Sequence, residues 1–182
     1  LLEHPEKAEG ANNIVIVGGG VVGCETAHWL ANEYGKNVTV LEMLPHFMMG
    51  VCTANRGHLL HYLEKSGVRL YNCTKVKALA KDGVYVEQNQ SQTVPDPYNT
   101  WQPLLPPNIP NPMEKAIKEE IVEKKIPADL IVLAMGGKAD ETFFFEAGEE
   151  HLAKEIYNIG DSSRAGRVLE AVRGAYHLAV RI

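Results

Sequence analysis

Short apolar runs alternate with longer amphipathic stretches over the first 71 residues of the chain. The run at 14–17 is wholly apolar and β-branched, which is typical of a strand at the centre of a parallel sheet. In the next stretch the apolar residues fall on one helical stripe, and Gly35 is placed to end that helix. The pattern predicts a strand at 14–17, a helix from 21 to about 34, a strand at 37–42, a helix at 53–66 and a strand at 67–71.

This alternation indicates the right-handed crossover unit of a doubly wound parallel sheet. The pattern changes after residue 71, because 75–89 carries a Lys-Asp-Gly turn between two strand-like runs and predicts a hairpin. Residues 90–113 are rich in Pro, Asn, Ser and Gln, and we interpret them as an exposed insertion within a strand meander. Trp101, Leu104 and Leu105 are candidates to pin this insertion to the surface, and the alternative is a proline-rich ligand for a partner.

The last third of the chain returns to short apolar runs. Residues 115–125 fit the last strand of the meander or a short helix, and 128–137 predicts a buried strand ending in glycines. After three consecutive phenylalanines, 155–159 predicts a strand, followed by a turn at Gly160 and Asp161 and a closing helix. The predicted fold class is therefore α/β: a Rossmann-like doubly wound parallel sheet, a three-stranded antiparallel meander and a C-terminal strand-helix tail.

Candidate chemistry is concentrated where the first strand meets the first helix. Gly18, Gly20 and Gly23 have the spacing G-x-G-x-x-G of dinucleotide-binding turns. Gly18 suits the sharp turn, Gly20 allows the backbone to approach a pyrophosphate, and Gly23 allows the helix to pack closely on the strand. The free N–H groups and partial positive charge of the helix N-terminus would then bind the phosphates without a basic side chain.

Dinucleotide-binding turns of this kind also use an acidic residue at the end of the next strand to bind the ribose. Glu42 ends the second predicted strand, 19 residues after Gly23. A carboxylate there accepts hydrogen bonds from both hydroxyls of an adenosine ribose and repels a 2′-phosphate. Because the following residues 43–47 contain no arginine, we predict NADH rather than NADPH. The alternative is that Glu42 is a solvated charge at a strand end.

Composition and charge exclude several other classes of protein. The chain has 182 residues, 45% of them hydrophobic and 23% charged, and a net charge of −5. An acidic chain is not expected to bind nucleic acid, and no apolar run is long enough to predict a membrane span. The three cysteines, Cys24, Cys52 and Cys73, form no redox pair or zinc spacing, so we interpret them as small buried thiols in a cytoplasmic protein. No metal site is predicted, and the histidines interpreted as structural are His28, His46, His58, His61 and His177.

Three motifs in order carry a family resemblance: the glycine turn with the strand ending in Glu42, the apolar stretch 128–137, and the stretch 156–179 around Gly160 and Asp161. Together they resemble the pyridine nucleotide–disulfide oxidoreductases, which bind two dinucleotides. Within that family the chain is most similar to the C-terminal parts of flavin oxidoreductases such as NADH oxidase, 2-enoate reductase and 2,4-dienoyl-CoA reductase. The resemblance spans nearly the whole chain except the insertion at about 90–113.

The resemblance implies an NAD-binding domain over 1–137 and the C-terminal segment of a split FAD-binding domain over 138–182. In the family, a late Gly-Asp pair binds the ribityl chain of FAD, and the next helix points its N-terminus at the flavin. Arg164 and Arg167 flank that turn and either neutralise flavin phosphates or are ordinary surface residues. The implied NAD site consists of Gly18, Gly19, Gly20, Val21, Val22, Gly23, Glu42, Gly136 and Gly137, and the implied FAD site of Gly160, Asp161, Val168 and Leu169.

Glu25 matches a family glutamate near the nicotinamide, and the alternative is a helix-terminal acid that interacts with the helix dipole. No catalytic residue is assigned with certainty.

The resemblance also implies a reaction: hydride passes from NADH to FAD and then to an enoate, an enoyl thioester or oxygen. Because the chain has a single G-x-G-x-x-G turn, we expect a fragment that binds NADH, holds FAD weakly or not at all, and is inactive alone. Its expected partner is the remainder of the flavoenzyme, namely the first half of the FAD domain and a possible N-terminal barrel. The alternatives are a non-enzymatic NAD(H)-sensing regulatory domain and, less favoured, a methyltransferase.

Overall fold

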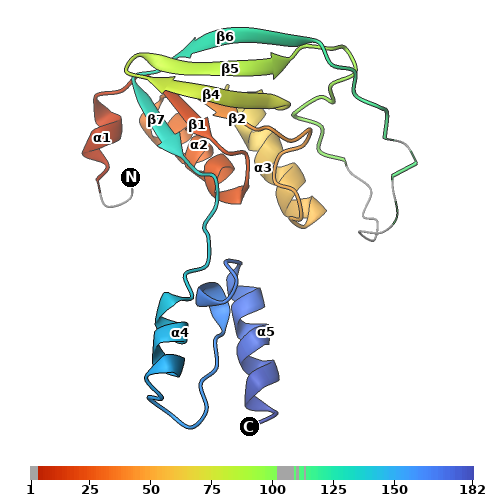
Figure 1. Ribbon diagram of the computed structural model, residues 1–182. Coiled ribbons are helices and arrows are strands. Elements are labelled where there is room, and N and C mark those ends of the chain that lie inside the picture. The colour runs from red at the N-terminus through yellow and green to blue at the C-terminus, as the bar shows by residue number, and fades with distance from the viewer. Residues whose placement is uncertain (1–3, 102–108, 110, 113) are drawn as a thin grey trace. The chain divides into compact units, whose positions relative to one another are not determined.

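The computed structural model describes residues 4–101, 109, 111–112 and 114–182 (Figure 1). The chain divides into two compact units, Leu1–Met135 and Gly136–Ile182. Unit 1 begins with the short helix α1 (Glu6–Glu9) and contains every strand of the described chain. Among the described residues, no helix combines the length and the apolar character that crossing a bilayer requires.

A four-stranded parallel sheet forms the centre of unit 1. Its strands are β1 (Asn13–Val17), β2 (Asn37–Leu41), β3 (Arg69–Tyr71) and β7 (Leu130–Leu133), in the spatial order β3-β2-β1-β7. All three pairings are parallel, so the predicted Rossmann-like parallel sheet is confirmed. The strand order reverses at β1, because the chain adds β2 and β3 on one side of it and β7 on the other.

Helices cover one face of this sheet. They are α2 (Val21–Tyr34) and α3 (Thr53–Lys65), and Gly35 ends α2 in the left-handed conformation with φ 60°. Alternate strand residues such as Ile14, Ile16 and Val40 pack with Leu30 and Leu60 in one buried core. This core is the result of the helical and strand periodicities read from the sequence.

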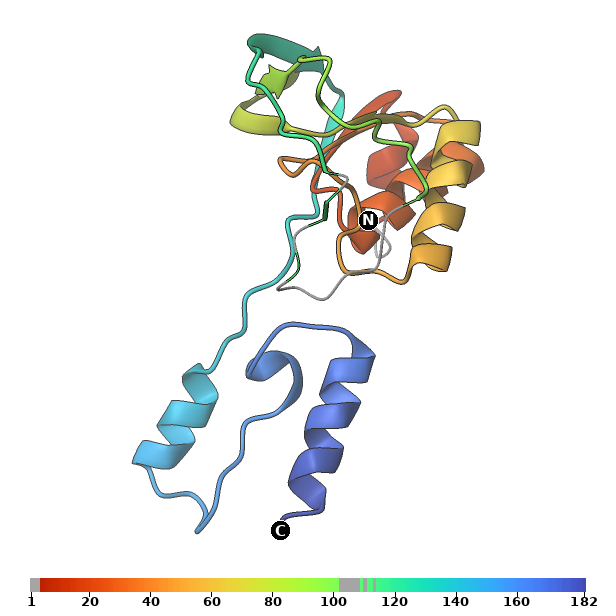
Figure 2. The ribbon, with the colours of Figure 1, turned by 90° about the vertical axis from the view of Figure 1, so that its right-hand side faces the viewer.

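A three-stranded antiparallel meander covers the other face, as Figure 2 shows from the side. Its strands are β4 (Thr74–Ala80), β5 (Gly83–Asn89) and β6 (Ile121–Pro127). Val15, Val17 and Leu41 pack against Val84 and Val86 in a second core. The predicted hairpin and meander are confirmed, and of the two alternatives for 115–125 the strand is correct, although it begins at Ile121.

The insertion is held differently from the prediction. Trp101 is 59% exposed and does not pin the segment, while Leu104 and Leu105 lie outside the described residues. Instead, the Tyr98 hydroxyl donates to the Val68 carbonyl at 2.5 Å and accepts from the Leu70 N–H at 3.2 Å. An aromatic side chain with a polar end thus attaches the segment to β3 at the sheet edge, where free backbone groups need partners.

Two other predictions about strands need correction. The strand expected at 128–137 forms over Leu130–Leu133 and is half-buried rather than buried, because β7 pairs with β1 alone and lies at the sheet edge. The strand expected at 155–159 is absent from the described part of unit 2. No other strand lies in the described part of unit 2 to share a ladder of hydrogen bonds with this segment, and a strand forms only with such a partner.

Unit 2 instead contains two helices and a tight turn. They are α4 (Thr142–Glu149), the 3-10 turn η1 (Gly160–Ser162) and α5 (Val168–Ala179). The three phenylalanines lie in α4, which the sequence pattern did not predict as a helix. The predicted closing helix is confirmed, and it begins at Val168.

Candidate dinucleotide site

The glycine turn connects β1 to α2 at the carboxyl edge of the parallel sheet. This edge lies beside the point where the strand order reverses, since β1 has β2 on one side and β7 on the other. Ligands of open α/β sheets bind in the crevice outside such a switch point. The topology alone therefore makes this turn the candidate binding site of unit 1.

Each glycine of the turn has a different environment. Gly18 has φ 113°, and a Cβ atom there would overlap the Ala134 carbonyl. A Cβ atom at Gly23 would overlap the Gly18 carbonyl, so the helix approaches the turn more closely than any other residue permits. At Gly20 a Cβ atom would have no neighbour within 4 Å, so this glycine faces open space. That space is where the backbone can approach a ligand.

The start of α2 supplies donors to the same space. Gly20 is the N-cap residue, and the first hydrogen bond of the helix runs from the Cys24 N–H to the Gly20 carbonyl at 3.0 Å. The N–H groups of Val21, Val22 and Gly23 precede that bond and have no partner within the helix. Together with the helix dipole, they make a site that suits the negative charge of a pyrophosphate.

Glu42 follows β2 and reaches across to the turn. Its half-buried carboxylate accepts a hydrogen bond from the Gly19 N–H at 2.8 Å through Oε2 and from the Leu44 N–H at 2.8 Å through Oε1. A carboxylate offers about four lone-pair positions, so two remain for the hydroxyls of a ribose. The residues around the glycine turn therefore fit a dinucleotide, with Glu42 at the ribose and the start of α2 at the phosphates.

Three residues that sequence reasoning missed fix the loop after Glu42. The Phe47 ring lies where a Gly19 side chain would be, and the Met48 N–H donates to the Gly19 carbonyl at 2.8 Å. Arg56 on α3 donates through Nε to the Phe47 carbonyl at 2.9 Å. The sequence did contain one signal that Arg56 is buried. Arg56 precedes Leu60 and Leu63 by four and seven residues, which places it on the buried face of α3.

Burial controls two titratable groups near the turn. It raises the pKa of the Cys24 thiol to about 12, with a further contribution from the nearby Glu42 carboxylate. Burial also lowers the pKa of His46, and the neighbouring positive charge of Arg56 lowers it further. At neutral pH, Cys24 therefore remains a thiol and His46 is mostly uncharged, so His46 offers little attraction for a phosphate.

The remaining residues predicted for the NAD site are Glu25, Gly136 and Gly137. Glu25 is exposed on α2, and no hydrogen bond or ion pair ties its side chain among the described residues. Gly136 has φ 86° and open space around its Cα, while Gly137 lies against Ala165 within unit 2. Because the glycine turn belongs to unit 1 and these two glycines to unit 2, their shared role in NAD binding remains a prediction.

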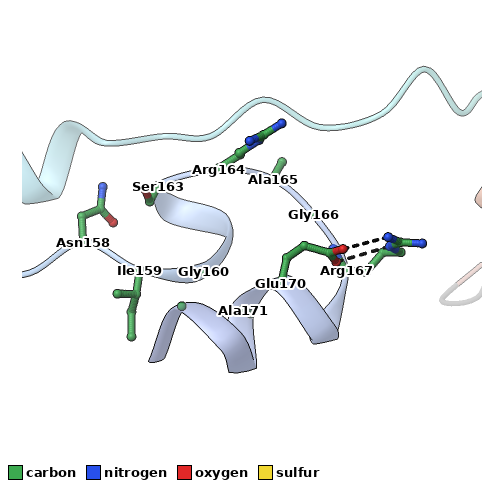
Figure 3. Close-up of a pocket in the computed structure, with 11 residues that line it drawn as sticks. Asn158, Ile159, Gly160, Ser163, Arg164, Ala165, Gly166, Arg167, Glu170 and Ala171 are labelled. Carbon is green, nitrogen blue, oxygen red and sulfur yellow. Dashed lines mark hydrogen bonds and ion pairs between the residues drawn. The ribbon is translucent and has the colours of Figure 1, made fainter. Parts of the chain in front are cut away.

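Of the residues predicted for the flavin site, Gly160 lines a pocket of about 540 Å³ within unit 2, together with Arg164 and Arg167 (Figure 3). Asp161, Val168 and Leu169 are not among the residues that line it. Gly160 has φ 68°, and Asp161 accepts a hydrogen bond from the Gly166 N–H at 3.2 Å. Arg167 and Glu170 form an ion pair at 2.7 Å and a capping box at the start of α5. Thus the exposed Arg167 already has a carboxylate partner.

At the start of α5, Val168 and Leu169 are 79% and 51% exposed. The N-terminus of α5 and the Asp161 carboxylate are therefore the candidate flavin-binding groups of unit 2, whose described residues contain no second G-x-G-x-x-G turn.

The cysteines and histidines show no catalytic arrangement in the described part of the chain. Cys24 is buried as expected, but Cys52 is exposed and Cys73 half-buried, which corrects their interpretation as buried thiols. Cys52 precedes α3 at its N-cap, outside the packed face of that helix. The rings of His28, His58 and His61 each make edge contacts with Tyr62, and no metal-binding cluster occurs among the described residues.

This geometry defines a Rossmann-like nucleotide-binding unit followed by a small helical unit. The model of the pyridine nucleotide-disulphide oxidoreductase family matches residues 2–173. The chain therefore belongs to that family, which confirms the resemblance drawn from its three motifs. A methyltransferase, the less favoured alternative, would not give such a match.

Several relatives are similar to this protein over nearly its whole chain. NADH oxidase from Thermoanaerobacter brockii is 27% identical over 169 residues, covering 93% of this chain and 21% of that protein. Bilirubin reductase from Mediterraneibacter gnavus is 27% identical over 177 residues, covering 97% of this chain and 22% of that protein. The chain thus spans about a fifth of the length of the curated relatives it matches.

A solved structure extends the likeness to three dimensions. The 2-naphthoyl-CoA reductase complex with 2-naphthoyl-CoA has a TM-score of 0.68 at 24% identity, covering 94% of this chain and 21% of that one. At this identity the likeness concerns the fold.

Proposed function

We propose that the chain is the NADH-binding region of an FAD-dependent oxidoreductase that passes hydride from NADH to FAD and on to an acceptor. One observation carries this proposal: the glycine turn faces open space at Gly20, and Glu42 is fixed beside it by the Gly19 N–H at 2.8 Å. Membership of the pyridine nucleotide-disulphide oxidoreductase family supports it, as does similarity to a protein named NADH oxidase.

The charges around Glu42 support NADH over NADPH. Glu42 would repel the 2′-phosphate of NADPH, and the depressed pKa of His46 leaves that side chain mostly neutral. Arg56 is 2% exposed and donates to backbone carbonyls, so its guanidinium is not available to a phosphate. In the proposed complex, the N–H groups at the start of α2 hold the pyrophosphate, and Glu42 orients the adenosine ribose.

We further propose that residues 138–182, which make up all of unit 2 except Gly136 and Gly137, are the closing segment of a split FAD domain. Its exposed apolar side chains need a covering partner, and the remainder of the same flavoenzyme would supply it. Among those exposed side chains are Phe143, Phe145, Leu152, Tyr157, Ile159, Val168, Val172 and Tyr176. When bound, FAD supplies the hydride acceptor, while Asp161 and the first residues of α5 hold one side of it.

The acceptor proposed here is an enoate, an enoyl thioester or oxygen. The names bilirubin reductase and NADH oxidase, borne by two relatives, support an organic acceptor and oxygen respectively. We propose the cytoplasm as its location, where free thiols such as those of Cys24, Cys52 and Cys73 remain reduced. Alone, without the other flavin-binding residues, the 182-residue chain is expected to be inactive.

Calorimetric titration of the chain with NADH, NADPH and FAD tests the proposal. We expect NADH to bind more tightly than NADPH by at least about tenfold, equivalent to 1.4 kcal/mol, and FAD to bind weakly or not at all. Reduction of flavin by NADH in the full-length protein containing this region tests the hydride transfer. An NADH-sensing regulatory domain would bind NADH but reduce no flavin, and failure to bind NADH at all would contradict both functions.

A further inference from the structure

The guanidinium of Arg56 is buried without a carboxylate partner among the described residues. Arg56 is 2% exposed, and its hydrogen bonds run to backbone carbonyls: from Nε to Phe47 at 2.9 Å, and from Nη1 to Asn99 at 3.0 Å and Thr100 at 3.5 Å. Burial lowers the pKa of Arg56 below its usual value. Burying a charge is costly, and here the three carbonyls that accept hydrogen bonds from the guanidinium compensate that cost.

On one side, Arg56 holds the loop that packs against the glycine turn. Phe47 is fully buried, and its Cε1 atom lies 2.6 Å from the position of a Gly19 Cβ. The next residue, Met48, has φ 52°, a conformation that non-glycine residues adopt at an energetic cost. Such a backbone persists where its surroundings fix it, here the bond from Arg56 to Phe47 and the bond from the Met48 N–H to Gly19.

On the other side, Arg56 holds the first half of the proline-rich insertion. Thr100 packs on α3 at Gly57, where a Cβ would lie 3.4 Å from the Thr100 Cβ. The Asn72 side-chain amide joins the same two segments a second time, donating to the Pro45 carbonyl at 2.7 Å and the Pro95 carbonyl at 2.9 Å. The loop after Glu42 is thus fastened to the insertion at two points.

We propose that Arg56 is a positioning residue for the nucleotide site, joining the insertion to the Phe47 carbonyl and thereby holding Gly19 in place for NADH. Arg56 makes no contact with the ligand in this role. It fixes Phe47 and Met48, which contact Gly19, and Gly19 in turn bonds Glu42. The inference rests on the proposed NADH binding by this turn, and it gives the insertion a function in the site.

Arg56→Met tests the role, because methionine has an unbranched side chain that replaces the aliphatic stem of arginine but carries no hydrogen-bond donor. We expect the NADH dissociation constant to rise about tenfold, since a small misplacement of binding groups is enough to produce such a loss. Amide hydrogen exchange at Met48 should accelerate more than exchange in the middle of β1. Arg56→Lys should give a smaller loss, because an ammonium can still donate to one of the carbonyls.

Asp129→Ala is the matched control for lost stability. Asp129 accepts hydrogen bonds from the N–H groups of Asn12 and Asn13 at 3.0 and 2.8 Å, at the opposite end of β1 from the glycine turn. We expect it to lower stability without changing NADH affinity.

Wild-type NADH affinity in both Arg56 variants would overturn the positioning role, and so would an equal loss of affinity in Asp129→Ala. If Arg56→Met does not fold, the NADH dissociation constant and the amide hydrogen exchange of Arg56→Lys test the role instead. Failure of the unaltered chain to bind NADH would overturn the proposed function and this role with it.

Discussion

The Gly19 N–H donates a hydrogen bond to the Glu42 carboxylate at 2.8 Å, across the carboxyl ends of β1 and β2. The acid that we propose for ribose binding is thus fixed before any ligand arrives, through the turn that would hold the phosphates. Preorganisation of this kind lowers the entropy that binding must overcome. A change at Glu42 should therefore affect both the order of the turn and the affinity for NADH.

Glu42→Gln should weaken NADH binding about tenfold, because an amide has one acceptor oxygen where the carboxylate has two and lacks the charge that strengthens both bonds. NADPH affinity should fall less or rise, since the repulsion of the 2′-phosphate disappears. Calorimetry with both nucleotides measures this change in preference. Glu33→Gln, at an exposed position near the other end of α2, is the control and should leave both affinities unchanged. An unchanged preference in Glu42→Gln would contradict the role of Glu42.

Gly20→Ala and Gly23→Ala should separate binding from folding. The Gly20 variant has room for its methyl group and a permitted φ of −71°, so it should fold normally but bind NADH at least about tenfold more weakly, because the ligand must approach that methyl. The Gly23 variant should lose about 1–3 kcal/mol of unfolding free energy or more, because its methyl overlaps the Gly18 carbonyl. Urea denaturation and NADH titration of both variants test the two expectations, and normal NADH affinity in Gly20→Ala would place the ligand elsewhere.

Thiol modification should distinguish the cysteines. Cys52 is exposed and should react with a thiol reagent near neutral pH, while the buried Cys24, with its pKa raised to about 12, should react only after unfolding. Mass spectrometry of the native and urea-unfolded protein identifies the labelled residue. Rapid labelling of Cys24 in the native state would show that α2 opens readily near the glycine turn.

The raised pKa of Cys24 also predicts a dependence of stability on pH. In the unfolded chain this thiol loses its proton near its usual pKa of 9.0, whereas in the folded protein it keeps the proton until about 12. Its contribution to stability is therefore complete below pH 9 and is lost as the pH rises toward 12. Denaturation of the wild type and of Cys24→Ser across this range should show a steeper decline in the wild type, and identical slopes would contradict the assignment.

Tyr98→Phe should lower the unfolding free energy by about 1–3 kcal/mol, because the hydroxyl both donates to Val68 and accepts from Leu70. NADH affinity should change little, since Arg56 still holds the Asn99 and Thr100 carbonyls. Tyr157→Phe is a matched control, because that exposed hydroxyl bonds only the exposed Glu155 carboxylate and should contribute almost nothing. Equal stability of Tyr98→Phe and the wild type would show that the insertion is held by other contacts.

The alternation of strands and helices could be predicted from sequence because it depends on local periodicity. Residues 14–17 and the stripe of α2 already determine which side chains face inward, and Gly35 ends the helix by its own conformational freedom. The spacing of Gly18, Gly20 and Gly23 likewise indicates a tight turn with one open side. The strand expected at 155–159 could not be decided in this way, because a strand needs a partner and local sequence does not say whether one is present.

By itself, the sequence determined the alternating strands and helices over residues 14–71, the glycine turn and the acid at the end of β2, all of which follow from residue type and spacing. Tertiary structure alone decided what surrounds them: that Glu42 bonds Gly19, that Phe47 fills the space beside it, and that Arg56 joins this loop to residues more than 40 positions away. The physical reason is that the bonds of Arg56 run to backbone carbonyls. Every residue has such a carbonyl, so no pattern of side chains in the sequence reveals which ones a buried guanidinium will bind.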